Sequence, residues 1–150
     1  MEHSERTRTV LDFLNGHVKM VLTVLDEKGA PNSSLMHYAI DDDMNFFMGT
    51  KKGFGKYSAL TADTRVAIAV VQEGLDPLQV VDIQARAEEI PGEKTAEAFA
   101  FFESKNHSLH YVKGADDYVM FKLVPSAIRW LDATSGELKI NDLKTGSPEK

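Results

Sequence analysis

The sequence predicts a mainly β protein in which about six antiparallel strands close into a barrel, with short helices at the start, middle and late positions. Short apolar runs alternate with turn residues along most of the chain. Two successive connections, at 27–31 and 41–43, are short enough to be hairpins, which favours an antiparallel meander. The 150 residues are 43% hydrophobic, so we expect one domain over residues 1–150 with a single core.

The first part of the chain predicts a helix followed by strands in tight succession. Val10, Leu11 and Leu14 share one face of an amphipathic helix. Gly29 can take positive φ in the first turn. The elements predicted here are a helix over 4–15 and strands over 18–26, 32–40 and 44–48.

The second part predicts long strands separated by helices. Val66, Ile68 and Val70 alternate as in a half-buried strand. Pro91 ends one long strand and Pro125 interrupts another. The elements predicted here are helices over 54–61, 94–103 and 106–114 and strands over 65–72, 78–90, 118–131 and 137–140; residues 1–3 and 144–150 are expected to fray.

Composition excludes several kinds of function. The chain has no cysteine, so disulfides, thiolate nucleophiles and cysteine metal sites are ruled out, and its charge of −6 argues against non-specific nucleic-acid binding. No apolar run approaches the ~20 residues that span a bilayer, and we expect a cytoplasmic protein. His107 and His110 are close to metal-ligand spacing but lack a matching partner, so no metal site is predicted.

Residues 48–60 differ in charge from the rest of the chain. No carboxylate lies between Asp43 and Asp63, and this stretch contains Lys51, Lys52 and Lys56. An anion bound here would meet ammonium groups, loop N–H groups and a helix N-terminus together. We expect a phosphate; the alternative is a solvated turn, because lysine is common on surfaces.

The order of these features resembles the pyridoxamine 5'-phosphate oxidase-like family of FMN-binding split β-barrels. The segments that carry it are VLTVLDEKGAP (21–31), MNFFMGT (44–50), KYSAL (56–60) and TRVAIAVV (64–71). They match a first strand ending in Asp-x-x-Gly-x-Pro, an aromatic strand ending in Thr, a lysine six residues later, and a strand beginning Arg-Val. The resemblance spans roughly residues 10–131 and implies a split barrel that binds FMN.

The resemblance also implies where the cofactor lies. Thr50 and Lys56 would hold the FMN phosphate. The isoalloxazine ring would lie along residues 33–37, largely against backbone groups, and residues 47–49 would border the ribityl chain.

Two further candidates come from later strands. Gln79 would reach the flavin from the other subunit or alongside it, and Trp130 either stacks on the flavin or packs in the core or dimer interface. His37 either acts on a flavin or substrate atom or is an ordinary strand histidine. The expected cofactor residues are Ser33, Ser34, Leu35, Met36, His37, Met48, Gly49, Thr50, Lys51, Lys52, Lys56, Gln79 and Trp130.

The resemblance implies a homodimeric flavin oxidoreductase with its site at the subunit interface. Many members carry Ser-Arg-Lys where this chain has Phe54, Gly55 and Lys56, so phosphate binding would depend more on neighbouring lysines and loop N–H groups. The vitamin B6 oxidase has a C-terminal Arg/His motif that residues 128–138 do not match, so pyridoxamine phosphate is not the expected substrate. The alternatives are a carrier of flavin, deazaflavin or haem with the same fold, in which His37 is a first candidate haem ligand, and a plain structural barrel.

Overall fold

A tight hairpin begins the sheet. The computed structural model describes residues 3–74, 76–106 and 117–146, in which β1 (Lys19–Leu25) pairs antiparallel with β2 (Pro31–His37). Gly29 has φ of 79°, as the turn prediction required. The Asp26 carboxylate accepts hydrogen bonds from the main-chain N–H groups of Lys28 and Ala30. The side chain thus closes the turn that sets the β1–β2 register.

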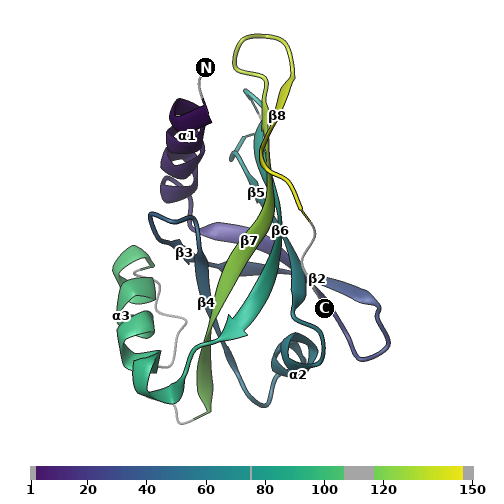
Figure 1. Cartoon of the computed structure of the whole chain (residues 1–150), viewed down its shortest axis with the longest axis vertical. Helices are drawn as coiled ribbons and strands as arrows, with labels where there is room; N and C mark the ends of the chain where they lie inside the picture. Colours follow the sequence, from purple (N-terminus) through teal and green to yellow (C-terminus); the bar gives the residue numbers. More distant parts are fainter. Residues whose placement is uncertain (1–2, 75, 107–116, 147–150) are drawn as a thin grey trace.

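The remaining strands continue this sheet, and every pairing is antiparallel. The strands lie in the order β2-β1-β5-β6-β7-β4-β3, with β8 beside the second half of β7 (Figure 1). This arrangement confirms the predicted antiparallel barrel class. The further strands are β3 (Ala39–Ile40), β4 (Phe46–Lys51), β5 (Arg65–Val71), β6 (Gln79–Glu89), β7 (Tyr118–Asp132) and β8 (Lys139–Lys144).

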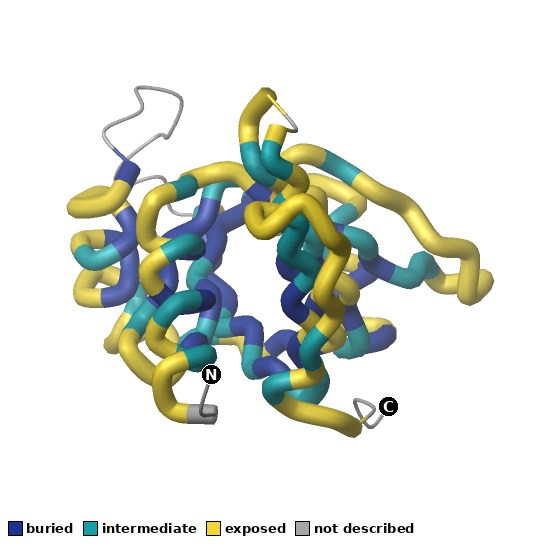
Figure 2. The backbone as a smooth tube through the Cα atoms, turned by 90° about the horizontal axis from the view of Figure 1, so that it is seen from above, coloured by how far each residue is buried: buried dark blue, intermediate teal, exposed yellow. Residues whose placement is uncertain are grey.

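The core lies inside the curled sheet, where alternate residues of β1, β5 and β6 are buried (Figure 2). The helix α1 (His3–Asn15) adds Val10, Leu11 and Leu14 to this core, on the face that the sequence predicts. α2 (Gly55–Ala62) buries Ala59 and Leu60 in the same core.

A second, smaller cluster lies under α3 (Thr95–Lys105), which follows the short helix η1 (Gly92–Lys94). Phe99 and Phe102 pack there against Ala39 and Met120. α3 therefore covers the side of β3, β4 and β7 opposite the main core.

Two strand predictions in the first half of the chain were wrong in part: one strand is divided, and the other begins and ends later than predicted. The predicted strand 32–40 is divided at Tyr38, whose buried hydroxyl donates to the Leu14 main-chain oxygen over 2.7 Å. The predicted strand 44–48 begins and ends later, because β4 pairs with residues 118–123 of β7. Thr50 and Lys51 therefore lie in a strand and not in a loop.

The predicted break of the long strand at Pro125 was also wrong. β7 runs through Pro125 because Ser126 is an extra residue at a β-bulge: Gln84 pairs with Ala127 and Ala85 with Pro125. The last strand, predicted over 137–140, ends at Lys144, so the expected fraying does not begin there. The predicted helix over 106–114, with His107 and His110, lies outside the described residues.

Candidate functional site

A groove between the start of α2 and the β1–β2 hairpin joins residues that are far apart in the chain. It measures about 370 Å³, and its lining includes three of the expected cofactor residues, Ser33, Ser34 and Lys56. The other lining residues are Val24, Asp26, Asn32, Gly55 and Ala59. The structure therefore gathers one ammonium group and two serines, and ammonium and hydroxyl groups can donate hydrogen bonds to an anion. The Ser33 hydroxyl already has a partner, because its Oγ lies 2.7 Å from Thr23 Oγ1.

Lys56 lies in the first turn of α2. It is partly buried, and this burial lowers the pKa of its ammonium group from the ordinary value. No side chain caps the helix, because Phe54 occupies the N-cap position. The lysine and the uncapped N–H groups of α2 thus face the same end of the helix, where an anion would be stabilised.

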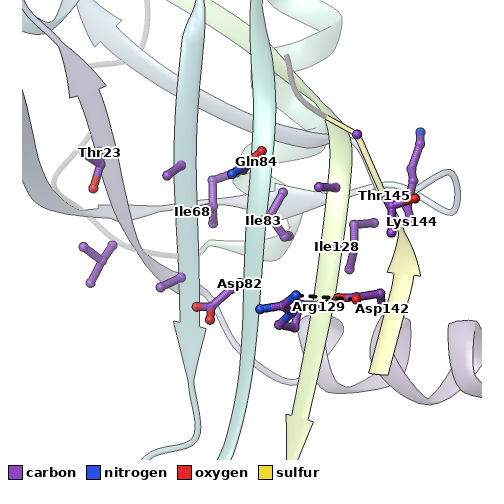
Figure 3. Close-up of a pocket in the computed structure, with 15 residues that line it drawn as sticks. Thr23, Ile68, Asp82, Ile83, Gln84, Ile128, Arg129, Asp142, Lys144 and Thr145 are labelled. Carbon is purple, nitrogen blue, oxygen red and sulfur yellow. Dashed lines mark hydrogen bonds and ion pairs between the residues drawn. The ribbon is translucent and has the colours of Figure 1, made fainter. Parts of the chain in front are cut away.

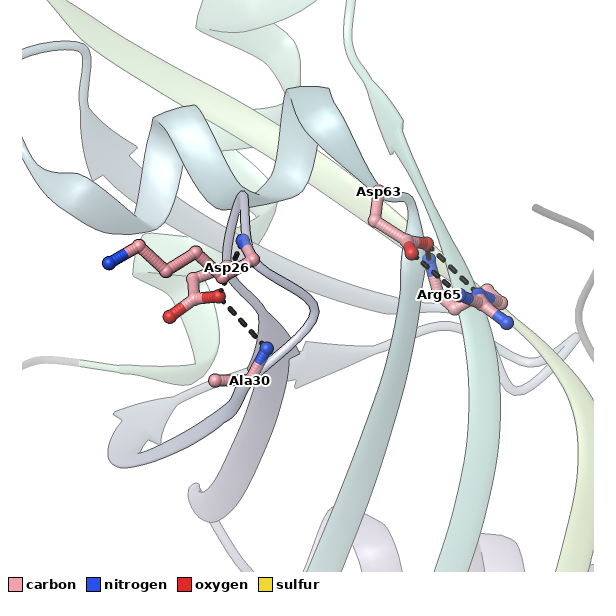
Figure 4. Close-up of polar contacts among 5 residues, drawn as sticks. Asp26, Ala30, Asp63 and Arg65 are labelled. Carbon is pink, nitrogen blue, oxygen red and sulfur yellow. Dashed lines mark hydrogen bonds and ion pairs between the residues drawn. The ribbon is translucent and has the colours of Figure 1, made fainter.

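Asp26 also lines the groove, and the sequence reading gave it no role in the site. Its carboxylate accepts from the N–H group of Ala30 (Figure 4). It also accepts from the N–H group of Lys28 and from Asn32 Nδ2. The Ala30 N–H is the largest of the causes that hold its pKa below the usual value. The signal was available in the Asp-x-x-Gly spacing, which is typical of a side-chain-closed turn.

The end of α2 is fixed by a second carboxylate. Asp63, 8% exposed, accepts hydrogen bonds from the Arg65 main-chain N–H and from Arg65 Nε and Nη2, at 3.1, 3.0 and 2.7 Å (Figure 4). Asp63 raises the pKa of the Arg65 guanidinium. This paired contact sets the direction in which β5 leaves the end of α2.

Thr50 and the neighbouring lysines do not line the groove. Thr50 lies in β4 and is only 4% exposed. Lys51 is partly exposed at the end of β4, and Lys52 is exposed in the turn that leads to α2.

The candidate strand β2 presents its residues to two sides. Ser34 and Met36 pair with Leu22 and Met20, whose side chains enter the core. Leu35 lies on the other side and is 66% exposed. At the end of the strand, His37 Nδ1 is 3.1 Å from Asn106 Oδ1, a partner that sequence reasoning missed because it comes 69 residues later.

Gln79 and Trp130 lie apart from the groove within this chain. Gln79 begins β6 beside the end of β5, while α2 meets the start of β5, about 20 Å away along the strand. Trp130 is 3% exposed and packs edge-on against Phe13, which favours the core-packing alternative. Met48 is fully buried in the main core.

Gly49 lies beneath the ring of Tyr118. Burial raises the pKa of Tyr118 to about 12, and its buried hydroxyl has no hydrogen-bond partner among the residues that the structure describes. A Cβ at residue 49 would overlap the phenol ring, so the close approach of this ring requires glycine.

A larger hollow, about 550 Å³, lies on the outer face of the sheet and contains none of the expected cofactor residues (Figure 3). On its polar side, Arg129 Nε forms a salt bridge with Asp142 Oδ1 over 2.8 Å. One row across this face is set by the strand registers and consists of Leu35, Val21, Ala69, Asp82, Arg129 and Asp142. The row is apolar at the β2 end and charged at the β8 end.

In the described parts of the chain, no group of three or more His, Cys, Asp or Glu side chains could hold a metal ion. Within the same residues, no helix has both the length and the apolar run that crossing a membrane requires.

The sequence matches the family model described as pyridoxamine 5'-phosphate oxidase over residues 7–132. A search of curated proteins found no match.

Three similar solved structures carry different descriptions. A heme binding protein from Mycobacterium smegmatis has a TM-score of 0.75 at 20% identity, covering 95% of this chain and 59% of that one, so this chain spans only about three fifths of its length. A putative pyridoxamine 5'-phosphate oxidase from Listeria innocua has a TM-score of 0.69 at 18% identity, with coverages of 83% and 96%. An F420 reductase has a TM-score of 0.62 at 19% identity, with coverages of 74% and 88%. At these identities the likenesses concern the fold alone.

Proposed function

Because the chain belongs to the pyridoxamine 5'-phosphate oxidase family, we propose that it binds FMN and acts as a flavin-dependent oxidoreductase on a small molecule. The observation that carries the proposal is the groove that joins Lys56 to Ser33 and Ser34. One ammonium group and two hydroxyl groups suit a phosphate, which accepts hydrogen bonds through its oxygens.

The electrostatics of the groove support an anionic ligand. Burial disfavours the charged form of Lys56, and a bound phosphate would offset that cost. The negative charge of Asp26 would repel a bound phosphate, although its carboxylate already accepts hydrogen bonds from N–H groups of its own turn. Thr50, which is 4% exposed in β4, would add a hydroxyl donor if the phosphate reaches that strand.

The ring of the flavin would lie along β2. His37 is about 10 Å beyond Ser34 along the strand, so residues 34–37 offer an extended backbone edge next to the groove. When bound, FMN supplies hydride or electron transfer through its N5. The chain's own residues would hold the phosphate, support the ring and limit the access of water.

We further propose a homodimer formed through the outer face of the sheet. Leu35 and Val21 are 66% and 40% exposed there, and the charged end of the row carries both signs. Such a face is self-complementary under a two-fold axis. Gln79 lies away from its own groove, so it would approach the flavin of the partner subunit.

A non-catalytic carrier of flavin, deazaflavin or haem with the same fold is the alternative. The description of one similar structure as a heme binding protein favours haem, and that of another as an F420 reductase favours a deazaflavin as the cofactor. A Soret band in the purified protein would support haem, whereas flavin bands with turnover of NADH or NADPH and an acceptor would support the oxidoreductase.

Titration with FMN tests the phosphate site directly. Lys56→Ala removes a charge-assisted contact, so we expect a loss of about 1.5–3 kcal/mol, roughly 10- to 150-fold in Kd. Lys139→Ala, on exposed β8, is the matched control and should bind as the wild type does. Equal affinity of Lys56→Ala and wild type would place the phosphate elsewhere, and a wild-type protein that does not bind FMN would refute the proposal.

A further inference from the structure

The side chain of Lys56 is turned toward the inner face of the β1–β2 hairpin. Lys56 and Ala59 are three residues apart on α2, so they share one face of the helix. Ala59 is buried, α2 packs against β1, and both residues line the groove. Across the groove, Ser34 pairs with Leu22, whose side chain enters the core, and directly opposed residues of a strand pair share a face. Lys56 and Ser34 therefore enter the groove from its two sides.

The amine of Lys56 is more nucleophilic than that of an exposed lysine. Burial lowers the pKa of its ammonium group, and this direction holds although the Asp26 carboxylate lines the same groove. A lowered pKa increases the fraction of neutral amine at neutral pH, and the neutral amine is the form that attacks carbonyl carbons. The groove thus combines an activated amine with an opening to solvent.

The surroundings of this amine favour one class of electrophile. An acyl phosphate carries a reactive carbonyl carbon next to a phosphate group. The phosphate can accept hydrogen bonds from the Ser34 hydroxyl and from the N–H groups at the start of α2, which no side chain caps. Binding of the phosphate in the groove would hold the carbonyl carbon beside the amine, and such proximity accelerates a reaction.

We propose that Lys56 is a modification site that is acylated by small acyl phosphates bound in the groove. The neutral amine attacks the carbonyl carbon, so that a C–N bond forms and the bond from this carbon to the phosphate oxygen breaks. Inorganic phosphate leaves with the electron pair, and one amine proton passes to water. The product is an uncharged acyl-lysine, which would weaken FMN binding. This consequence rests on the proposed function, whereas the acylation itself requires no FMN.

Acetylation of the wild-type protein tests the site directly. Peptide mass spectrometry measures the rates at Lys56 and at Lys139, an exposed lysine on β8, with acetyl phosphate and with an uncharged acetyl ester. We expect the ratio of the Lys56 rate to the Lys139 rate to be roughly 10-fold higher with acetyl phosphate, as for one charge-assisted hydrogen bond to the phosphate. Inorganic phosphate should slow acetylation of Lys56 and leave that of Lys139 unchanged. Equal ratios with the two reagents, or no protection by inorganic phosphate, would overturn the inference.

The effect on the cofactor is measured separately by titration with FMN before and after treatment with acetyl phosphate. The treated wild type should lose about 10-fold or more in affinity, because Lys56 loses its charge. Lys56→Arg keeps a positive charge and has no amine to acylate, so treatment should not change its own Kd. Equal losses in both proteins would overturn the link to cofactor binding. If the wild type binds no FMN but is acetylated selectively at Lys56, the proposed function fails and the modification site stands.

Discussion

Substituting Gly49 with alanine tests how closely Tyr118 packs on β4. The added Cβ would meet Tyr118 Oη and lie 2.5 Å from Cε1 and 2.6 Å from Cζ. Real Cβ atoms essentially never approach this closely. The ring has little room to move away, because its other side meets Phe99 edge-on, with ring centroids 5.5 Å apart.

The expected cost follows from overpacking a buried site. We expect Gly49→Ala to lower the free energy of unfolding by about 1–3 kcal/mol. For a chain of this length that corresponds to a fall in Tm of roughly 2–12 °C. Gly53→Ala is the matched control: a Cβ at residue 53 meets nothing within 4 Å, so its effect should be within about 0.5 kcal/mol.

A double-mutant cycle identifies the cause. Tyr118→Leu removes the ring, so in that background Gly49→Ala should cost less than about 0.5 kcal/mol and the coupling energy should exceed about 1 kcal/mol. Urea denaturation at one fixed protein concentration measures all four proteins. Additive costs in the cycle would refute the explanation by close packing.

Two further predictions concern the turn and the sheet face. Asp26→Asn should be less stable than wild type near neutral pH, because the Ala30 and Lys28 N–H groups stabilise the charged carboxylate and hold its folded pKa below the ordinary value. The extra stability of the wild type should be present above the unfolded pKa and be lost as pH falls through the folded pKa. A difference in unfolding free energy that stays constant with pH would contradict this explanation. Leu35→Asp should give monomers in sedimentation velocity. The control is Leu138→Asp, which replaces an exposed leucine outside the cross-sheet row and should leave the dimer intact. Equal masses for both variants would argue against the proposed interface.

Local chemistry was sufficient to predict the elements whose ends are set by nearby residues. The turn after β1 is determined by Asp26 and by the positive φ of Gly29, both within a few residues. The inward face of α1 follows from the spacing of Val10, Leu11 and Leu14. In these places the sequence contains the interacting partners side by side.

Elements whose limits depend on distant partners could not be predicted. The end of β4 is set by pairing with Tyr118 and Val119, and the path of β7 through Pro125 by a bulge opposite Gln84. Of the expected cofactor residues, Ser33, Ser34 and Lys56 line the groove. The contact between Asn106 and His37 could not be predicted, because no local sequence pattern connects two residues that lie 69 positions apart.

The position of β7 has a consequence for how the chain folds during synthesis. This strand is the neighbour of β6, β4 and β8, and it joins Lys51 to Tyr118 across 66 intervening residues. Until the ribosome has released β7, one edge of β4 and one edge of β6 have no partner, and the core between them is open. Pairings of such sequence separation form slowly. In the interval between the emergence of β6 and the completion of β7, the nascent chain would therefore expose strand edges that can pair with other chains.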